Sequence, residues 1–489
     1  AGPAGAATTP AIALTASDGA GLRLVGLRAR AWVEAPLALT ELHLEFENPE
    51  DRTLEGRFAI QLPPRAAVSR FAMKIGDLWQ EGEVVERQQA RRVFEEFLHR
   101  RQDPALLEHD AGERFSARVF PIPPRARKQL ILTYSQELAG AHADYRLPLA
   151  GLPQLDTLDL AILGPDPHDP RASVELYRAR ESNVARPDAP ALREVDGPPE
   201  LGLRSGDLAL ARITIPGAAT PSGPPRAVTL LLDTSASQAP QFAAHVARLS
   251  ALIERLGAAH GATLPLRVWC FDQEALELFR GPAGEFSARH IDHILRRRAL
   301  GASDLARALA AIRPGVRPGE RIVLLGDGVI TAGAHEGRAL SRSVAALRGA
   351  GVARIDAVFT GADHDLATLT RLTTADTDAG VLVDGSLAAP TIVDKLRRPG
   401  LAAIPVSVPG SRWTWPERLD GVQPGDTALV YSDLPAGLPL TVELAGQARP
   451  RLTTRTVERP LLERAWVGAR IQRLLAVRDE LPVGDADMR

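Results

Sequence analysis

The chain has 489 residues, of which 45% are apolar and 24% charged, and its 58 basic side chains are nearly matched by 60 acidic ones. These proportions are typical of soluble globular domains, and the length predicts two or three of them rather than a single core. A net charge of −2 excludes a general attraction to nucleic acid or to an anionic membrane.

The first 138 residues predict mainly β-strands. Residues 42–46 alternate apolar and polar side chains as half-buried strands do, and residues 129–134 supply a later strand. Between them, the apolar side chains of residues 90–98 fall on one face of a helix. We therefore expect an N-terminal tail at residues 1–9, followed by a β-sandwich with one inserted helix at residues 10–138.

Residues 139–226 are rich in proline, glycine and aspartate, and they contain short strand-like pieces such as residues 209–215. This composition predicts a β-rich connecting region. Its last part, from Pro216 to Pro225, consists mostly of proline, glycine, serine and alanine and is the best candidate for a linker.

From Ala227 onwards, buried strands alternate with helices. Residues 227–232 form a continuous apolar run, as a parallel sheet requires, and helical and strand-like segments then take turns. This alternation predicts a doubly wound α/β domain at residues 227–402. The remaining residues, 403–489, predict further strands and a final amphipathic helix, so the expected fold class is a multidomain α/β plus β protein.

Polar side chains gather where the predicted parallel strands end. Asp233 directly follows the first strand of the α/β domain, and Asp327 follows a later strand after one glycine. Ligands of open α/β sheets bind outside the carboxyl ends of the strands, so we expect these two carboxylates to converge. Ser235 and Ser237 lie in the first strand–helix loop, and Ser303 precedes another helix and can reach the same crevice.

Carboxylates and hydroxyls are hard oxygen donors that suit Mg²⁺, Mn²⁺ or Ca²⁺. Two acids neutralise a divalent ion, whereas neutral hydroxyls leave it electrophilic, so a position held by water can accept an aspartate or glutamate of a partner protein. A simpler interpretation stays open at this point. Serines at such positions also cap helices, and an aspartate after a strand also caps a turn.

The segment Asp233-Thr234-Ser235-Ala236-Ser237, the loop Gly301-Ala302-Ser303 and the pair Asp327-Gly328 together resemble the metal-ion-dependent adhesion site of von Willebrand factor A domains. The resemblance implies that the three serines are hydroxyl ligands and that the two aspartates act mainly through bound waters. The sequence departs from the family pattern twice. Ser303 stands where threonine is usual, and Gly326 replaces the threonine that usually precedes the last aspartate.

The N-terminal region resembles the vault protein/inter-alpha-trypsin (VIT) domain over about residues 10–138. The matching segments are residues 71–77, 82–87, 105–108, 115–123 and 132–134, together with Ala90 and Phe94. A VIT domain followed by an A domain is the arrangement of inter-alpha-trypsin inhibitor heavy chains and of many bacterial envelope proteins. It implies a non-enzymatic adhesion or protein-interaction protein that binds an acidic protein partner.

Two alternatives remain beside this hypothesis. One is a structural scaffold whose metal site does not work, and the other is a metal-dependent hydrolase, for which Asp304 is the one adjacent spare acid. The small residues at positions 1–7 are compatible with a processed N-terminus, and we expect a location in the bacterial envelope or outside the cell. No apolar run of about 18 residues predicts a transmembrane helix.

Overall fold

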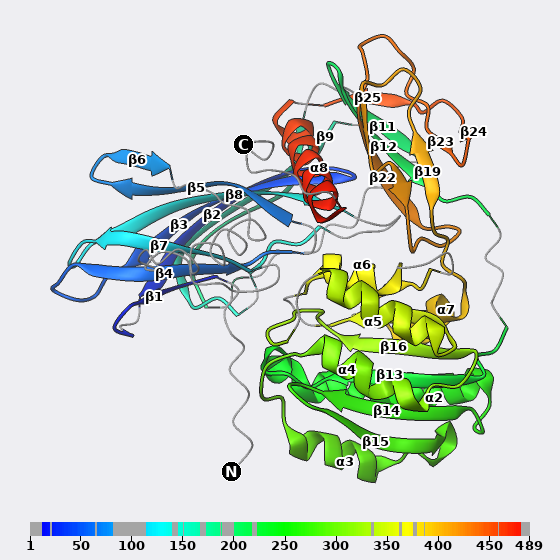
Figure 1. Cartoon of the computed structure of the whole chain (residues 1–489). Coiled ribbons are helices and arrows are strands. Elements are labelled where there is room, and N and C mark those ends of the chain that lie inside the picture. The colour runs from blue at the N-terminus through cyan, green and yellow to red at the C-terminus, as the bar shows by residue number, and fades with distance from the viewer. Residues whose placement is uncertain are drawn as a thin grey trace.

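The structure is a computed structural model, and it describes residues 12–19, 22–63, 66–81, 114–138, 145–149, 151–166, 173–185, 187, 200–217, 223–333, 337–360, 364–374, 379–385, 387–457 and 459–480. The expected N-terminal tail at residues 1–9 and the expected helix near residues 90–98 lie outside these ranges. The described strands and helices form a β-sandwich, an α/β unit and a second β unit (Figure 1). This mixture confirms the predicted fold class.

The N-terminal sandwich consists of a three-stranded sheet in the order β1-β4-β7 and a seven-stranded sheet in the order β10-β9-β2-β3-β8-β5-β6. Its strands are β1 (Ile12–Ala16), β2 (Arg23–Glu34), β3 (Leu37–Glu47), β4 (Leu54–Gln61), β5 (Ala66–Ile75), β6 (Leu78–Glu81), β7 (Arg114–Ile122), β8 (Arg127–Glu137), β9 (Leu155–Pro165) and β10 (Ser173–Val184).

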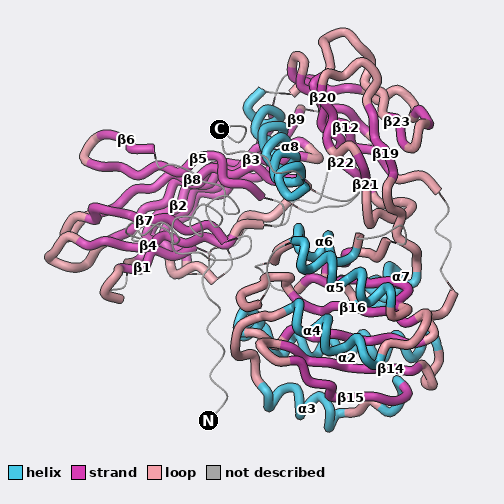
Figure 2. Tube along the Cα trace, viewed as in Figure 1, coloured by secondary structure: helices cyan, strands magenta, loops and turns pink. Residues whose placement is uncertain are grey.

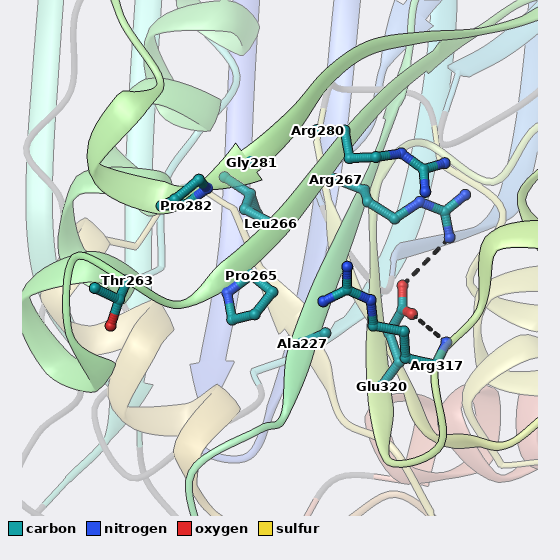
Figure 3. A pocket seen from close by; sticks show the side chains of 10 residues that line it. All are labelled: Ala227, Thr263, Pro265, Leu266, Arg267, Arg280, Gly281, Pro282, Arg317 and Glu320. Carbon is teal, nitrogen blue, oxygen red and sulfur yellow. Dashed lines mark hydrogen bonds and ion pairs between the residues drawn. The ribbon is translucent and has the colours of Figure 1, made fainter.

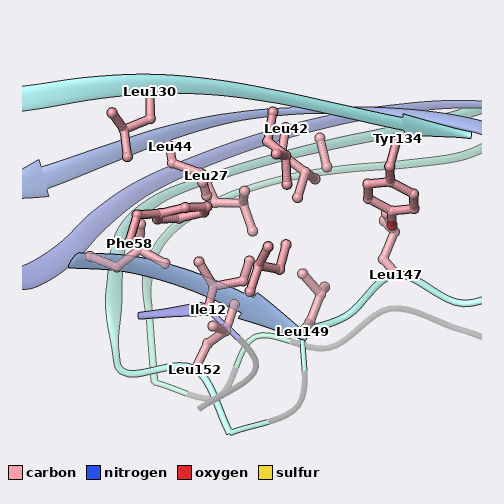
Figure 4. Packing of buried hydrophobic residues seen from close by; sticks show 14 of the residues in the cluster. Ile12, Leu27, Leu42, Leu44, Phe58, Leu130, Tyr134, Leu147, Leu149 and Leu152 are labelled. Atoms are coloured by element: carbon pink, nitrogen blue, oxygen red, sulfur yellow. The ribbon is translucent and has the colours of Figure 1, made fainter. Parts of the chain in front are cut away.

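The core of the sandwich lies between its two sheets. Figure 4 shows Leu42, Leu44 and Leu130 of the larger sheet beside Ile12 and Phe58 of the smaller one. Along β3 buried residues alternate with partly exposed ones, as the sequence pattern predicts. Burying each such side chain contributes about 1.5–3 kcal/mol to stability.

The expected connecting region at residues 139–226 is divided between two units in the structure. Strand β9 pairs in parallel with β2, and β10 pairs with β9, so both belong to the large sheet of the sandwich. The physical reason is that β9 supplies Leu158, Leu160 and Ile162 to the sandwich core. Because the sequence around these strands is rich in proline and glycine, their place in the sandwich could not be predicted from it.

The α/β unit has one six-stranded sheet in the order β15-β14-β13-β16-β17-β18, parallel except for the edge strand β15. The strands are β13 (Ala227–Asp233), β14 (Pro265–Phe271), β15 (Ala275–Pro282), β16 (Glu320–Gly326), β17 (Val352–Phe359) and β18 (Leu382–Asp384). The helices are η1 (Ala236–Gln241), α2 (Phe242–His260), η2 (Ala283–Glu285), α3 (Ala288–Arg297), α4 (Leu305–Ile312), η3 (Arg313–Gly315), α5 (Gly337–Gly349), α6 (Leu366–Thr373) and α7 (Ala389–Arg397).

Helices cover both faces of this sheet (Figure 2). Apolar residues of α2, α3 and α7 pack in one buried cluster, and those of α4, α5 and α6 pack in another. Because β13 is buried along its whole length, it carries the continuous apolar run that the sequence showed. The unit is therefore doubly wound, and the carboxyl ends of β13, β14, β16 and β17 meet at one edge.

The second β unit is built from chain segments on both sides of the α/β unit. One sheet has the order β20-β22-β12-β11-β25, and the other β21-β19-β23-β24. The strands are β11 (Leu201–Ser205), β12 (Leu208–Thr214), β19 (Ile404–Ser407), β20 (Trp413–Trp415), β21 (Arg418–Leu419), β22 (Thr427–Asp433), β23 (Glu443–Leu444), β24 (Gln447–Ala448) and β25 (Thr454–Thr456).

Strands β12 and β22 are paired antiparallel from Leu208 and Asp433 to Thr214 and Thr427. The α/β unit is thus inserted between two paired strands of this β unit. The two units also touch where α7 ends, because the Gln423 side chain donates hydrogen bonds to the carbonyls of Lys395 (2.8 Å) and Arg398 (3.1 Å).

The last helix, α8 (Arg459–Glu480), joins the second β unit to the sandwich (Figure 1). Its Leu462 is fully buried in a cluster that includes Leu37 of β3 and Leu210 of β12. Near this cluster the Tyr431 hydroxyl donates a hydrogen bond to Glu137 Oε1 at 2.5 Å. Within the described part of the chain, no helix is long and apolar enough to cross a membrane.

Shortening Leu462 tests the role of α8 as this connector. We expect Leu462→Ala to lower the free energy of unfolding by about 2–5 kcal/mol, because it removes buried methyl groups and leaves a cavity. The matched control is Val467→Ala in the same helix, where the side chain is 45% exposed. Urea unfolding followed by circular dichroism measures both, and equal effects of the two changes would contradict the prediction.

Candidate metal centre

The two aspartates lie at the ends of adjacent parallel strands. Leu232 of β13 pairs with Leu325 of β16, so Asp233 and Asp327 emerge at the same edge of the sheet. Each is only 1% exposed. Burial, and then the negative charge of Asp327, raise the pKa of Asp233 to about 7. The two carboxylates therefore share one poorly solvated site, which favours a proton or a cation between them.

The first loop, which follows Asp233, carries two serine hydroxyls that lie close together. The backbone N–H of Ser235 donates to Asp233 Oδ1 at 2.8 Å, which folds the loop back onto the carboxylate. The Oγ atoms of Ser235 and Ser237 then lie 3.1 Å apart. Ser235 is buried and Ser237 exposed, so this pair of oxygens extends from the aspartates toward the surface.

Ser303 is held beside this first loop by backbone hydrogen bonds. The N–H of Ala236 donates to the Gly301 carbonyl at 2.9 Å, and the N–H of Leu300 donates to the Thr234 carbonyl at 3.1 Å. On its other side, the Ser303 N–H donates to Thr331 Oγ1 at 2.8 Å, in the segment that follows Asp327. Ser303 is 3% exposed. The loops that carry the predicted residues are thus tied together.

Helix capping does not account for these serines. Ser235 occupies the position before η1, but its side chain makes no capping hydrogen bond. The residue that caps α4 is Asp304, which accepts a hydrogen bond from the N–H of Arg307 at 3.0 Å, and Ser303 stands one residue earlier. The hydroxyls of Ser235 and Ser303 are therefore not needed to begin these helices.

Steric contact with Asp233 explains why glycine occupies position 326 in this structure. A Cβ atom at position 326 would lie 2.8 Å from the Cβ of Asp233, closer than two carbon atoms can approach without displacement. The glycine lets Asp233 pack directly against the end of β16. The departure from the family pattern at this position therefore matches the tight packing of the two strand ends.

Gln238, directly after the serine motif, is not among the site residues that the sequence predicts. Its side chain is 3% exposed, and its Nε2 donates to Asp327 Oδ2 at 2.7 Å. The sequence offered one signal for it, namely that Gln238 is a polar residue in a helical turn next to the predicted site. Its burial depends on the contact with Asp327, 89 residues away, which no local pattern reveals.

Two buried histidines lie in segments that flank the site. His364 contacts Phe359 with the two rings tilted at 38° and their centroids 4.7 Å apart. It lies just before Asp365, whose N–H donates to the Asp327 carbonyl at 2.7 Å. His245 lies on α2, where burial, and then the charge of Arg248, lower its pKa to about 4. A histidine with so low a pKa is a weak general base at neutral pH.

A pocket of about 250 Å³ lies at the opposite end of the sheet, by the amino ends of β13 and β14 (Figure 3). Two of the arginines that line it, Arg267 and Arg280, are paired with carboxylates. Arg267 contacts the carboxylates of Glu277 (3.3 Å) and Glu320 (3.5 Å), and Arg280 contacts both oxygens of Glu277. These ion pairs stabilise the base of the sheet, and the pocket shares no residue with the aspartate site.

The donors that the sequence predicts are of a chemical kind that suits a divalent cation preferring oxygen. Two buried carboxylates and three serine hydroxyls are hard ligands of the kind that Mg²⁺, Mn²⁺ and Ca²⁺ take. Across the residues that the structure describes, no group of three or more histidine, cysteine, aspartate or glutamate side chains gathers to hold a metal. A site in these regions would therefore depend on the hydroxyls as well as on the acids.

A family model confirms the VIT resemblance of the N-terminal part of the chain. Residues 24–134 match the family model described as the vault protein inter-alpha-trypsin domain. A curated mouse protein, the mono-ADP-ribosyltransferase PARP4, is 28% identical over 94 residues, which cover 19% of this chain and 5% of that protein. This chain thus spans a small part of the length of that relative.

Solved structures with some similarity include von Willebrand factor A proteins. One is the type A protein from Catenulispora acidiphila, with 15% identity, a TM-score of 0.30, and coverage of 54% of this chain and 71% of that one. Another is the ArnB paralog VWA2 from Sulfolobus acidocaldarius, with 16% identity, a TM-score of 0.26, and coverage of 48% and 64%. The strand order and register themselves establish the fold of the α/β unit.

Adding one methyl group at position 326 tests the packing of the strand ends. We expect Gly326→Ala to lower the free energy of unfolding by about 1–3 kcal/mol, because the new Cβ must displace Asp233. Gly349→Ala is the matched control, since a Cβ there meets no other atom within 4 Å. Chemical unfolding in the presence of a chelator compares the two. If Gly326→Ala left the free energy of unfolding unchanged, this close packing would not be required.

The lowered pKa of His245 predicts a pH-dependent stability. The unfolded histidine binds a proton near pH 6.5, whereas the buried one resists protonation down to about pH 4. The folded protein therefore binds fewer protons in this range, and stability falls as the pH is lowered from 6.5 to 4, by at most about 3 kcal/mol. We expect His245→Leu to remove this part of the pH dependence in urea unfolding. Parallel curves for both proteins would contradict it.

Proposed function

We propose that this chain, whose residues 24–134 match the VIT domain family, is an interaction protein that binds a partner through a divalent cation in its α/β unit. The cation would be held by Asp233, Ser235, Ser237, Ser303 and Asp327. The observation that carries the proposal is the pair of buried aspartates at adjacent strand ends, with the Ser235 and Ser237 hydroxyl oxygens next to each other.

The physical argument is one of charge. Two carboxylates removed from water are unfavourable unless a proton or a cation compensates them. The Asp233 pKa near 7 reflects this situation, and a bound Mg²⁺ would relieve it by neutralising both charges. Mg²⁺ is the ion we propose first, and Mn²⁺ and Ca²⁺ share its preference for oxygen ligands.

The mode of binding follows from the neutral hydroxyls. Three of the five proposed ligands carry no charge, so the ion would keep an affinity for one more negative oxygen. An aspartate or glutamate of a partner protein supplies such an oxygen. The exposed Ser237 places the outer part of the site at the surface, where a partner has access. We propose such an acidic protein ligand as the partner.

Binding is better supported than catalysis. Asp304, the spare acid of the hydrolase alternative, caps α4 through the Arg307 N–H. His245 is buried and has a pKa of about 4, so it is a poor general base. The scaffold alternative is separated from the proposal by metal binding. From the order of a VIT domain and an A-type domain, we propose a location in the bacterial envelope or outside the cell.

Titration calorimetry with Mg²⁺ and Mn²⁺ tests the cation site. We expect the chain to bind one ion and Asp233→Ala to abolish binding, because the variant removes one of two charges that face the ion. Asp394→Ala is the matched control, since that aspartate lies on α7 and is largely exposed. Absence of binding to the unchanged chain at millimolar ion would refute the proposal and favour the scaffold.

A further inference from the structure

Gln238 connects the proposed cation site to a third strand. The residue lies on η1, and its amide group is buried between Asp327 and Thr360. Nε2 donates to Asp327 Oδ2 at 2.7 Å, and the Thr360 hydroxyl donates to Oε1 at 3.3 Å. Thr360 directly follows β17, and its own N–H donates to the Gly326 carbonyl at 3.2 Å. The side chain therefore links the ends of β13, β16 and β17.

The two ends of this amide have distinct roles. Thr360 presents a hydroxyl hydrogen to Oε1, so the NH₂ group is turned toward Asp327. Asp327 is held from both sides, because its Oδ1 accepts a hydrogen bond from the Val329 N–H at 2.9 Å while its Oδ2 accepts from Gln238. These two hydrogen bonds fix the orientation of the Asp327 carboxylate.

We propose that Gln238 and Thr360 are positioning residues of the cation site, which hold the Asp327 carboxylate in the orientation that the ion requires. This inference rests on the proposed function. Groups that orient a metal ligand typically change metal affinity by about 10–100-fold when they are removed. Gln238 has the features of such a group, because it is buried, directly bonded to the ligand and itself oriented by a second residue.

The burial of Gln238 is explained by its hydrogen bonds to Asp327 and Thr360. A glutamine in a short surface helix ordinarily extends into water, and its neighbours Ala239 and Gln241 are indeed exposed. Burying a primary amide without partners is unfavourable, so its burial here depends on the bonds to Asp327 and Thr360. Among the described residues, its side chain is hydrogen-bonded to Asp327 and Thr360, which lie at the strand ends that build the site.

Gln238→Met tests the proposal, because methionine keeps the length and approximate volume of the side chain but cannot donate to Asp327. We expect the dissociation constant for Mn²⁺ or Mg²⁺, measured by calorimetry on the full chain, to rise about tenfold. Thr360→Val should raise it by a smaller factor, because the amide keeps its donor but loses its orientation. In the Gln238→Met background, Thr360→Val should have no further effect on affinity.

Gln241→Met is the matched control, since it makes the same exchange at an exposed position of the same helix. Unfolding in a chelator separates a loss of affinity from a general loss of stability. Unchanged ion affinity in a folded Gln238→Met protein would overturn the inference and leave the proposed function standing. Independent effects of the two changes on affinity would also overturn it. If the unchanged chain binds no ion, the proposed function itself fails.

Discussion

Asp233 and Asp327 leave the ends of two neighbouring parallel strands, and both carboxylates are removed almost completely from water. This arrangement is unfavourable by itself, because each negative charge opposes the other in a region of low dielectric constant. The rest of the α/β unit accommodates it. Gly326 allows the close approach, the Ser235 and Val329 N–H groups donate to the carboxylates, and Gln238 donates a further hydrogen bond. The proposed divalent cation would neutralise both charges.

The α/β unit is joined to the second β unit at both of its ends and near α7. The α/β unit is inserted into the second β unit, because β12 precedes it and β22, the strand paired with β12, follows it. The Gln423 contacts that join these units lie where α7 ends, and Tyr431 and α8 tie the second β unit to the sandwich. The connections between units are thus made by residues other than the proposed metal ligands.

Local patterns were sufficient for some features. The alternation in β3 and the apolar run of β13 follow directly from burial on one face or on both faces of a sheet, so both strands were predictable. The convergence of Asp233 and Asp327 was predictable because parallel strands end at a common edge. The VIT resemblance was recognisable from motifs spread along residues 71–134, and the match to residues 24–134 confirms it.

Other features depend on contacts between distant segments. The sequence by itself determined the alternation of strands and helices in the α/β unit and the residue types at its strand ends, since these arise from periodicity and from chemistry within short windows. Only the tertiary structure decided that β9 joins the sandwich, that β12 pairs with β22, and that Gln238 is buried against Asp327. Each of these depends on which surfaces remain to be covered after the local elements have formed, and that is a property of the whole chain.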